Sequence, residues 1–214
     1  AVGDITSEYT GAVLAIDPSG RGADETGYAV VKMINGYLYV PAAGGLQGGY
    51  DADTLVELAH IAKKHKVNAV IVESNFGDGR FTKLIEPVFA KIPPVTIEEV
   101  RHSTQKERRI IDTLEPVMMK HKLVVSPEVI EQDYRTAQKY ERAVRLPKML
   151  FYRMTRITNG RGCLRHDDRL DALAIAVGYF TEQMARDEEM GIDIIKQDAL
   201  DQELRRFMDN ARDP

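Results

Sequence analysis

The sequence has little cysteine and no tryptophan, and it lacks the motifs of several common protein classes. Its 214 residues include a single cysteine, which excludes an intramolecular disulfide framework and a cysteine-based zinc cluster. The five histidines form no HExxH motif, so a protease of the zincin class is excluded. No apolar run approaches about 18 residues, the length of a transmembrane helix. We therefore expect a reducing compartment and no membrane association.

Charge is unevenly distributed along the chain, whose formal net charge is −4. Between Arg135 and Arg169 there are ten Lys and Arg residues and three acidic ones, whereas from Glu182 onward ten acids outnumber five bases. A basic segment is typical either of a solvated face or of a surface that neutralises phosphates. We expect a main domain over residues 1–185 and an acidic C-terminal tail over 186–214.

Apolar runs and turn signals predict a mixed α/β domain. Short apolar runs at 11–17 and 67–74 indicate buried strands, and each carries an acid at or near its end. Asn35-Gly36, flanked by two β-rich runs, predicts a hairpin. The segment 168–180 is apolar almost all round, as expected of a buried helix. The order of elements predicts a mixed sheet of five strands, three antiparallel and then parallel ones, with helices on both faces.

Shorter signals assign some of the remaining segments. Thr54 and Thr104 are each followed three residues later by Glu, which predicts a capping box at a helix N-terminus. The polar segment 127–145 predicts one helix. The run MLFYRMTRIT at 149–158 predicts β-structure.

Carboxylates stand at the ends of the most apolar elements. Asp17 ends the first strand, Glu73 lies at the end of the second apolar strand, and Asp168 and Asp171 open the buried helix, about 60° apart on a helical wheel. Each has an ordinary explanation as a turn, surface or helix-capping acid. Together they predict one site for paired hard cations, because oxygen ligands suit Mg²⁺ or Mn²⁺ rather than Zn²⁺. Such ion pairs commonly drive phosphodiester hydrolysis.

The same residues carry a resemblance to a known family. AIDPSGRGADETGYAVV, VNAVIVESNFGDG, TQKERRIIDTLEP and HDDRLDALAIAV occur in this order between residues 11 and 180. With them the chain resembles the ribonuclease H-like, RuvC-type nuclease domain of bacteriophage terminase large subunits. The resemblance implies a ribonuclease H-like fold and a two-metal-ion endodeoxyribonuclease that cleaves concatemeric double-stranded viral DNA during genome packaging. It also implies that Asp17, Glu73 and the helix acids Asp168 and Asp171 hold two Mg²⁺ or Mn²⁺ ions, with Asp167 as the alternative to Asp168.

Further residues are candidates for supporting roles. Asp167, Asp24 and Lys106 are candidates for positions beside the site. The basic segment offers candidates for contact with DNA phosphates, namely Arg145, Lys148, Arg153 and Arg156.

The resemblance also implies partners: double-stranded DNA, a packaging ATPase domain, the portal and the small terminase subunit, all in the host cytoplasm. Full terminase large subunits carry the packaging ATPase, yet this chain has no GxxxxGK[ST] phosphate loop and no initiator Met. We therefore expect the chain to be the C-terminal half of such a protein, without ATPase activity of its own.

Other interpretations stay open. A RuvC-type junction resolvase or a transposase-like nuclease would share the fold and the acids and differ in its DNA substrate. An actin- or sugar-kinase-like nucleotide-binding domain would share the sheet order, and the turn Asp17-Pro18-Ser19-Gly20 has some likeness to its phosphate-holding turn. That fold repeats itself in two halves, however, and no internal repeat is visible here. A non-catalytic DNA- or portal-docking module is disfavoured by the acids.

Overall fold

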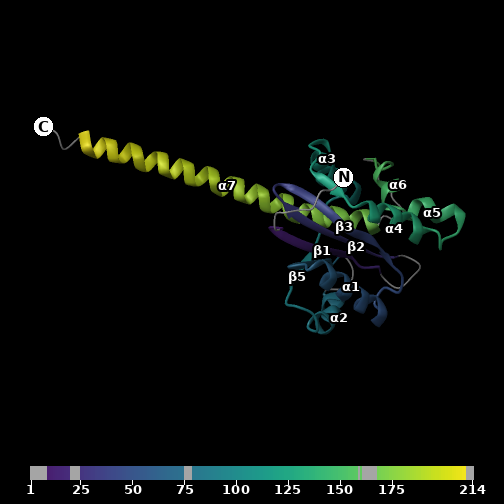
Figure 1. The fold of residues 1–214 in the computed structure, drawn as a ribbon. Coiled ribbons are helices and arrows are strands. Elements are labelled where there is room, and N and C mark those ends of the chain that lie inside the picture. The colour runs from purple at the N-terminus through teal and green to yellow at the C-terminus, as the bar shows by residue number, and fades with distance from the viewer. Residues whose placement is uncertain (1–8, 20–24, 75–78, 159, 161–167, 211–214) are drawn as a thin grey trace. The chain divides into compact units, whose positions relative to one another are not determined.

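The computed structural model describes residues 9–19, 25–74, 79–158, 160 and 168–210. It forms two compact units, Ala1–Gly178 and Tyr179–Pro214. The first unit contains a mixed sheet with helices on both of its faces (Figure 1). In the second unit the described residues belong to one helix, which begins in the first unit. Where the nuclease domain ends and the acidic tail begins stays a prediction.

The sheet has six strands in the spatial order β5-β4-β1-β2-β3-β6. Along the chain these strands are β1 (Gly11–Asp17), β2 (Thr26–Ile34), β3 (Tyr37–Leu46), β4 (Ala69–Glu73), β5 (Thr96–Val100) and β6 (Leu123–Val125). The first three strands are antiparallel to one another, β1 against β2 and β2 against β3, whereas β4 is parallel to β1 and β5 is parallel to β4. This arrangement confirms the predicted mixed sheet, but its expected size of five strands was wrong. The sixth strand, β6, adds three residues in parallel to the outer edge of β3.

The turn between β2 and β3 is the predicted hairpin. Asn35 has φ +50° and Gly36 has φ +75°. A two-residue turn of this type needs positive φ at both central positions, which asparagine tolerates and glycine adopts freely. The hairpin prediction is therefore confirmed.

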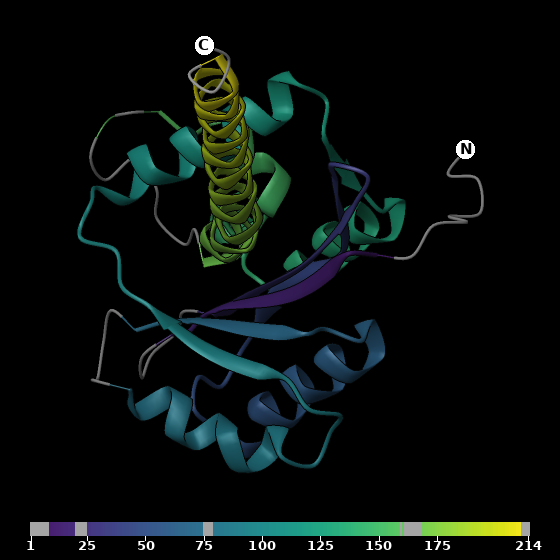
Figure 2. The ribbon, with the colours of Figure 1, turned by 90° about the vertical axis from the view of Figure 1, so that its left-hand side faces the viewer.

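Helices cover both faces of the sheet (Figure 2). In chain order they are α1 (Ala52–His65), α2 (Arg80–Phe89), α3 (Lys106–Met119), α4 (Pro127–Ala137), α5 (Arg142–Lys148), α6 (Leu150–Met154) and α7 (Asp168–Asn210). One face packs on α1 and α2 through Leu14 and Ile16 of β1, together with Leu58 and Ile85. Val13 and Ala15, which point to the opposite face of the sheet, are also fully buried. Burial on both faces explains why β1 and β4 are apolar without alternation.

Two predicted helix starts were wrong. Helix α1 begins after Asp51, and the Thr54 hydroxyl donates to the carbonyl of Gln47 (2.9 Å) instead of capping the helix. Helix α3 begins after Gln105, so Thr104 is not its capping residue. In both cases the helix was correctly located, but its first residue was not.

The region between residues 127 and 158 differs most from the sequence prediction. The expected single helix over 127–145 is two helices, α4 and α5, separated by residues 138–141. The expected β-structure at 149–158 is wrong, because residues Leu150–Met154 form α6. The carboxylate of Asp133 in α4 accepts hydrogen bonds from the backbone N–H groups of Leu150 (2.9 Å) and Phe151 (3.3 Å). This distant carboxylate satisfies the first donors of the short helix, which local sequence patterns do not reveal.

The start of α7 lies directly on the backbone of β2. A Cβ atom added at Gly27 would overlap the carbonyl oxygen of Asp168. The absence of a side chain at this position therefore lets the first turn of α7 approach the sheet.

We expect Gly27→Ala to destabilise the domain by about 1–3 kcal/mol, because backbone atoms must move to admit the new methyl group. The matched control is Gly178→Ala in α7, where the added Cβ would be 3.7 Å from the Thr113 methyl carbon. That change should be neutral or stabilising by up to about 1 kcal/mol, since alanine favours helix more than glycine does. Urea unfolding followed by circular dichroism measures both, and equal midpoints for Gly27→Ala and the unsubstituted chain would contradict the close approach.

Within the described part of the chain, no helix combines the length and the apolar character needed to cross a membrane.

Candidate functional site

Asp17 and Glu73 lie side by side at one edge of the sheet. They end β1 and β4, which are parallel neighbours whose register pairs Ile16 with Val72. The carboxyl ends of parallel strands meet at the same edge, so the two acids that follow this pair are neighbours. Glu73 is 4% exposed and the side chain of Asp17 is 13% exposed. The structure therefore brings together the two strand acids that the sequence singled out.

Asp171 joins them from the first turn of α7. Its side chain is completely buried, and one carboxylate oxygen from each of Asp17, Glu73 and Asp171 lies within 4.8 Å of the other two. We call these three residues the acidic cluster. It combines acids from two strands and one helix, as the sequence predicted.

Two cations from α3 reach into the acidic cluster. The ammonium of Lys106 lies 2.8 Å from Asp171 Oδ2 and 3.4 Å from Asp17 Oδ2. The guanidinium of Arg109 lies 2.5 Å from Asp171 Oδ1 and 3.3 Å from Glu73 Oε1. Helix α3 follows β5, whose carboxyl end lies at the same sheet edge as those of β1 and β4, so its first turn supplies both side chains. Asp171 is thus the acid that contacts both cations.

The two cations offset only part of the rise in the carboxyl pKa values that burial and mutual repulsion cause. Burial raises the pKa of Asp17 well above its ordinary value; Lys106 lowers it, while Asp171, Glu73 and Asp168 raise it. Burial, followed by repulsion from Asp171, also raises the pKa of Glu73 against the opposing effect of Arg109. Both shifts mean that additional positive charge would stabilise the ionised carboxylates.

The acidic cluster offers a suitable donor set for a hard divalent cation. All of its ligand atoms are carboxylate oxygens, which Mg²⁺ and Mn²⁺ prefer. Asp171 Oδ2 is buried and accepts no hydrogen bond from the described residues, so its charge is compensated there by the ion pair with Lys106. A buried oxygen in this state is costly unless a cation or a donor satisfies it. The residues therefore fit the predicted metal.

Of the other predicted acids, Asp168 lies among the described residues, and it is not in the acidic cluster. Asp168 is half-buried one turn earlier in α7, and its charge contributes to raising the pKa of Asp17, but its oxygens are not among the converging ligand atoms. Asp167 and Asp24 lie outside the described residues. Of the two helix acids that the sequence predicted, the structure thus brings Asp171 to the strand acids.

The four candidate DNA-binding residues differ in exposure. Arg156 is exposed, and its guanidinium lies over the ring of Tyr152 at 5.2 Å. Arg145 is half-buried. Lys148 and Arg153 are 4% and 9% exposed, so neither presents its charge on the surface of this conformation. A DNA-binding role stays a prediction for Arg145 and Arg156, and for the two buried residues it would require rearrangement.

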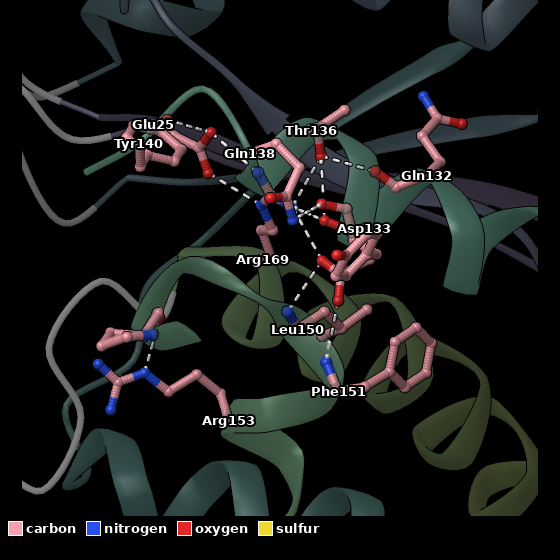
Figure 3. A network of polar contacts seen from close by, with 12 residues as sticks. Glu25, Gln132, Asp133, Thr136, Gln138, Tyr140, Leu150, Phe151, Arg153 and Arg169 are labelled. Atoms are coloured by element: carbon pink, nitrogen blue, oxygen red, sulfur yellow. Dashed lines mark hydrogen bonds and ion pairs between the residues drawn. The ribbon is translucent and has the colours of Figure 1, made fainter. Parts of the chain in front are cut away.

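A buried ion network beside the site was not predicted (Figure 3). Arg169, between Asp168 and Asp171 in α7, is 2% exposed. Its guanidinium donates to both carboxylate oxygens of Glu25 (2.9 and 3.0 Å) and to Asp133 Oδ1 (2.8 Å). Burial alone would raise the pKa of Glu25, but Arg169 holds it below its ordinary value, with help from Tyr140 and Lys139. The sequence signal for this ion network is Arg169, a charged residue near the start of the mostly apolar segment 168–180.

Comparisons with known proteins agree with this arrangement. Residues 16–123 match the family model of the ribonuclease H-like domain of the bacteriophage T7 terminase. The chain is also 47% identical over 182 residues to the terminase large subunit of Enterobacteria phage T3, an alignment that covers 85% of this chain and 31% of that protein. The chain belongs to the T7-type terminase ribonuclease H-like family.

Solved structures of terminase nuclease domains share the fold of this terminase domain. The nuclease domain of the large terminase subunit gp2 of bacterial virus Sf6 is 13% identical, with a TM-score of 0.55 and coverage of 80% of this chain and 89% of that one. The human cytomegalovirus terminase nuclease domain, soaked with Mn, is 15% identical, with a TM-score of 0.54 and coverage of 78% and 82%. The segment matched by the family model contains Asp17, Glu73, Lys106 and Arg109, whereas α7 with Asp171 lies beyond it.

Proposed function

We propose that this terminase domain is a two-metal-ion endodeoxyribonuclease that cleaves concatemeric double-stranded viral DNA during genome packaging. The observation that carries this proposal is the convergence of three carboxylates from β1, β4 and α7, within 4.8 Å of one another. Family membership and the relative from phage T3, named as a terminase large subunit, support the substrate and the setting.

In this proposal Asp17, Glu73 and Asp171 hold Mg²⁺ or Mn²⁺. When bound, the ions would supply Lewis-acid stabilisation of the phosphate and a reactive water at neutral pH. The protein contributes orientation, because one nitrogen of Arg109 bonds both Glu73 and Asp171 and keeps their carboxylates facing each other. The near-complete burial of Glu73 and Asp171 keeps competing water away from these ligand oxygens.

The proposed partners follow from the same family. Duplex DNA would contact basic side chains such as Arg156 through its phosphates, a mode of binding that does not read sequence. The packaging ATPase domain, the portal and the small terminase subunit are the proposed protein partners, in the host cytoplasm. The aligned region makes up 31% of the phage T3 protein, and this chain has no GxxxxGK[ST] phosphate loop, so packaging ATPase activity is not assigned to it.

The experiment that tests the function is cleavage of supercoiled plasmid. With Mg²⁺ or Mn²⁺ we expect nicked and then linear DNA with scattered cut positions; with chelator we expect none. A four-way junction offered beside linear duplex tests the resolvase alternative, which predicts preference for the junction. Undiminished cutting in chelator, or no cutting by folded protein with either metal, would contradict the proposal.

A further inference from the structure

The ammonium of Lys106 lies where it neutralises two members of the acidic cluster at once. It is 2.8 Å from Asp171 Oδ2 and 3.4 Å from Asp17 Oδ2. A Mg²⁺ ion bound to those two oxygens would lie roughly 2.0–2.1 Å from each. A positive group this close to the same oxygens would repel the ion strongly in a buried site. The ammonium and a metal ion shared by Asp17 and Asp171 therefore compete for the same carboxylate charge.

The two cations of the site are held differently. Arg109 is 11% exposed, and one of its nitrogens hydrogen-bonds Glu73 and Asp171. Lys106 is 37% exposed; its ammonium donates a long hydrogen bond to Asp17 Oδ2 (3.4 Å) and forms an ion pair with Asp171 Oδ2. A lysine ammonium sits on a flexible four-carbon stem, whereas the planar guanidinium is held in a fixed geometry. Lys106 is therefore the cation that can leave, and Arg109 the one that stays.

We propose that Lys106 is a displaceable internal counter-ion: it neutralises Asp17 and Asp171 in the metal-free domain and moves out when a divalent cation binds. The proposal rests on the proposed metal site. Metal loading is then an exchange of one cation for another instead of the filling of a bare acidic pocket. The acidic cluster can stay folded and ionised without metal, at the cost of weaker metal binding.

The displaced ammonium stays near the site, because its helix does not need to move. A bound phosphodiester brings negative charge to the same edge of the sheet and would favour the displaced position of Lys106. Metal and DNA should therefore strengthen each other's binding through this side chain, and by linkage the effect is equal in both directions.

The first test is Mn²⁺ binding measured by calorimetry without DNA, so that no cleavage is involved. Lys106→Met removes the charge and keeps most of the stem, and it should tighten Mn²⁺ binding on the order of tenfold. The matched control is Arg108→Met on the same helix, which removes an equal charge from an exposed side chain paired with Asp112. That control should change the affinity by less than about twofold, because exposed charges are screened.

The second test uses the unsubstituted chain and needs no variant to fold. Amine-acylation rates of individual lysines are measured by mass spectrometry with and without Mn²⁺. Labelling of Lys106 should increase several-fold with metal, while Lys139, which pairs with Glu25 and with no member of the acidic cluster, should not change.

The outcomes separate the two proposals. Failure of the unsubstituted chain to bind Mn²⁺ would contradict the proposed metal site itself. Normal Mn²⁺ binding combined with unchanged affinity in Lys106→Met, or with equal or slower labelling of Lys106, would overturn the counter-ion role alone.

Discussion

Asp171→Asn is expected to reduce metal-dependent DNA cleavage by about a thousandfold. Asp171 is completely buried, contacts both Lys106 and Arg109, and supplies the helix ligand of the acidic cluster. Losing one charged ligand removes several kcal/mol of transition-state stabilisation, and about 1.4 kcal/mol corresponds to tenfold in rate. Asparagine keeps the size of the side chain, so the fold should persist. Single-turnover nicking of plasmid DNA measures the effect.

Asp168→Asn is the matched comparison, because it removes the same charge three residues earlier in the same helix. Its carboxylate is not among the converging ligand atoms and acts on Asp17 through charge. We expect a loss of at most roughly 10–100-fold, the range typical of residues behind the ligands. Stabilisation by Mn²⁺, read as a shift in Tm, should largely disappear in Asp171→Asn and persist in Asp168→Asn. If Asp168→Asn proves as inactive as Asp171→Asn, the ligand set assigned to α7 is wrong.

Arg169→Met should destabilise the domain by about 3–5 kcal/mol. The substitution leaves Glu25 and Asp133 buried without their shared cation, and removing one partner of a buried ion pair has this effect. The guanidinium of Arg169 also connects three segments: Glu25 directly before β2, helix α4, and the turn of α7 that carries Asp171. Urea unfolding followed by circular dichroism gives the change in the free energy of unfolding.

Arg135→Met serves as the control for charge and size. Arg135 is 77% exposed and pairs with Glu131 one turn away in α4. An exposed pair of this kind contributes less than about 1 kcal/mol. Comparable losses of stability in Arg169→Met and Arg135→Met would contradict a special stabilising role of the buried network, because the two substitutions remove the same charge.

The positions of Asp17 and Glu73 could be predicted because the controlling pattern is local. A buried strand reads as a short apolar run, and an acid at its end falls at the edge of the sheet whatever the rest of the chain does. Two such strands that run parallel bring their last residues together, as the pairing of Ile16 with Val72 does. The turn at Asn35-Gly36 was equally local, since its two positive φ angles depend on those residues themselves.

The tertiary structure alone decided which helix acid joins them. Asp168 and Asp171 are about 60° apart on a helical wheel, so periodicity allowed either. The rotation of α7 about its axis is set by its close contact with Gly27 and by the hydrogen bonds from the Arg169 guanidinium to Glu25 and Asp133. Arg169 is 36 positions from Asp133 and 144 positions from Glu25, so these contacts lie beyond the reach of any local window of sequence.

Contacts between distant segments also account for other features of the structure that local sequence patterns did not give. Helix α6 exists where β-structure was expected because Asp133, 17 residues before Leu150, caps its first turn. Lys106 was a sequence candidate for a position beside the site, and Arg109 joins it there because α3 starts at the sheet edge where β1, β4 and β5 end. The sequence by itself determined β1, β4, the hairpin between β2 and β3, and the positions of Asp17 and Glu73, through local patterns of burial and turn chemistry. Only packing between distant segments decided the helix ligand and the cations around it, because charge pairing inside a protein depends on which chain segments meet.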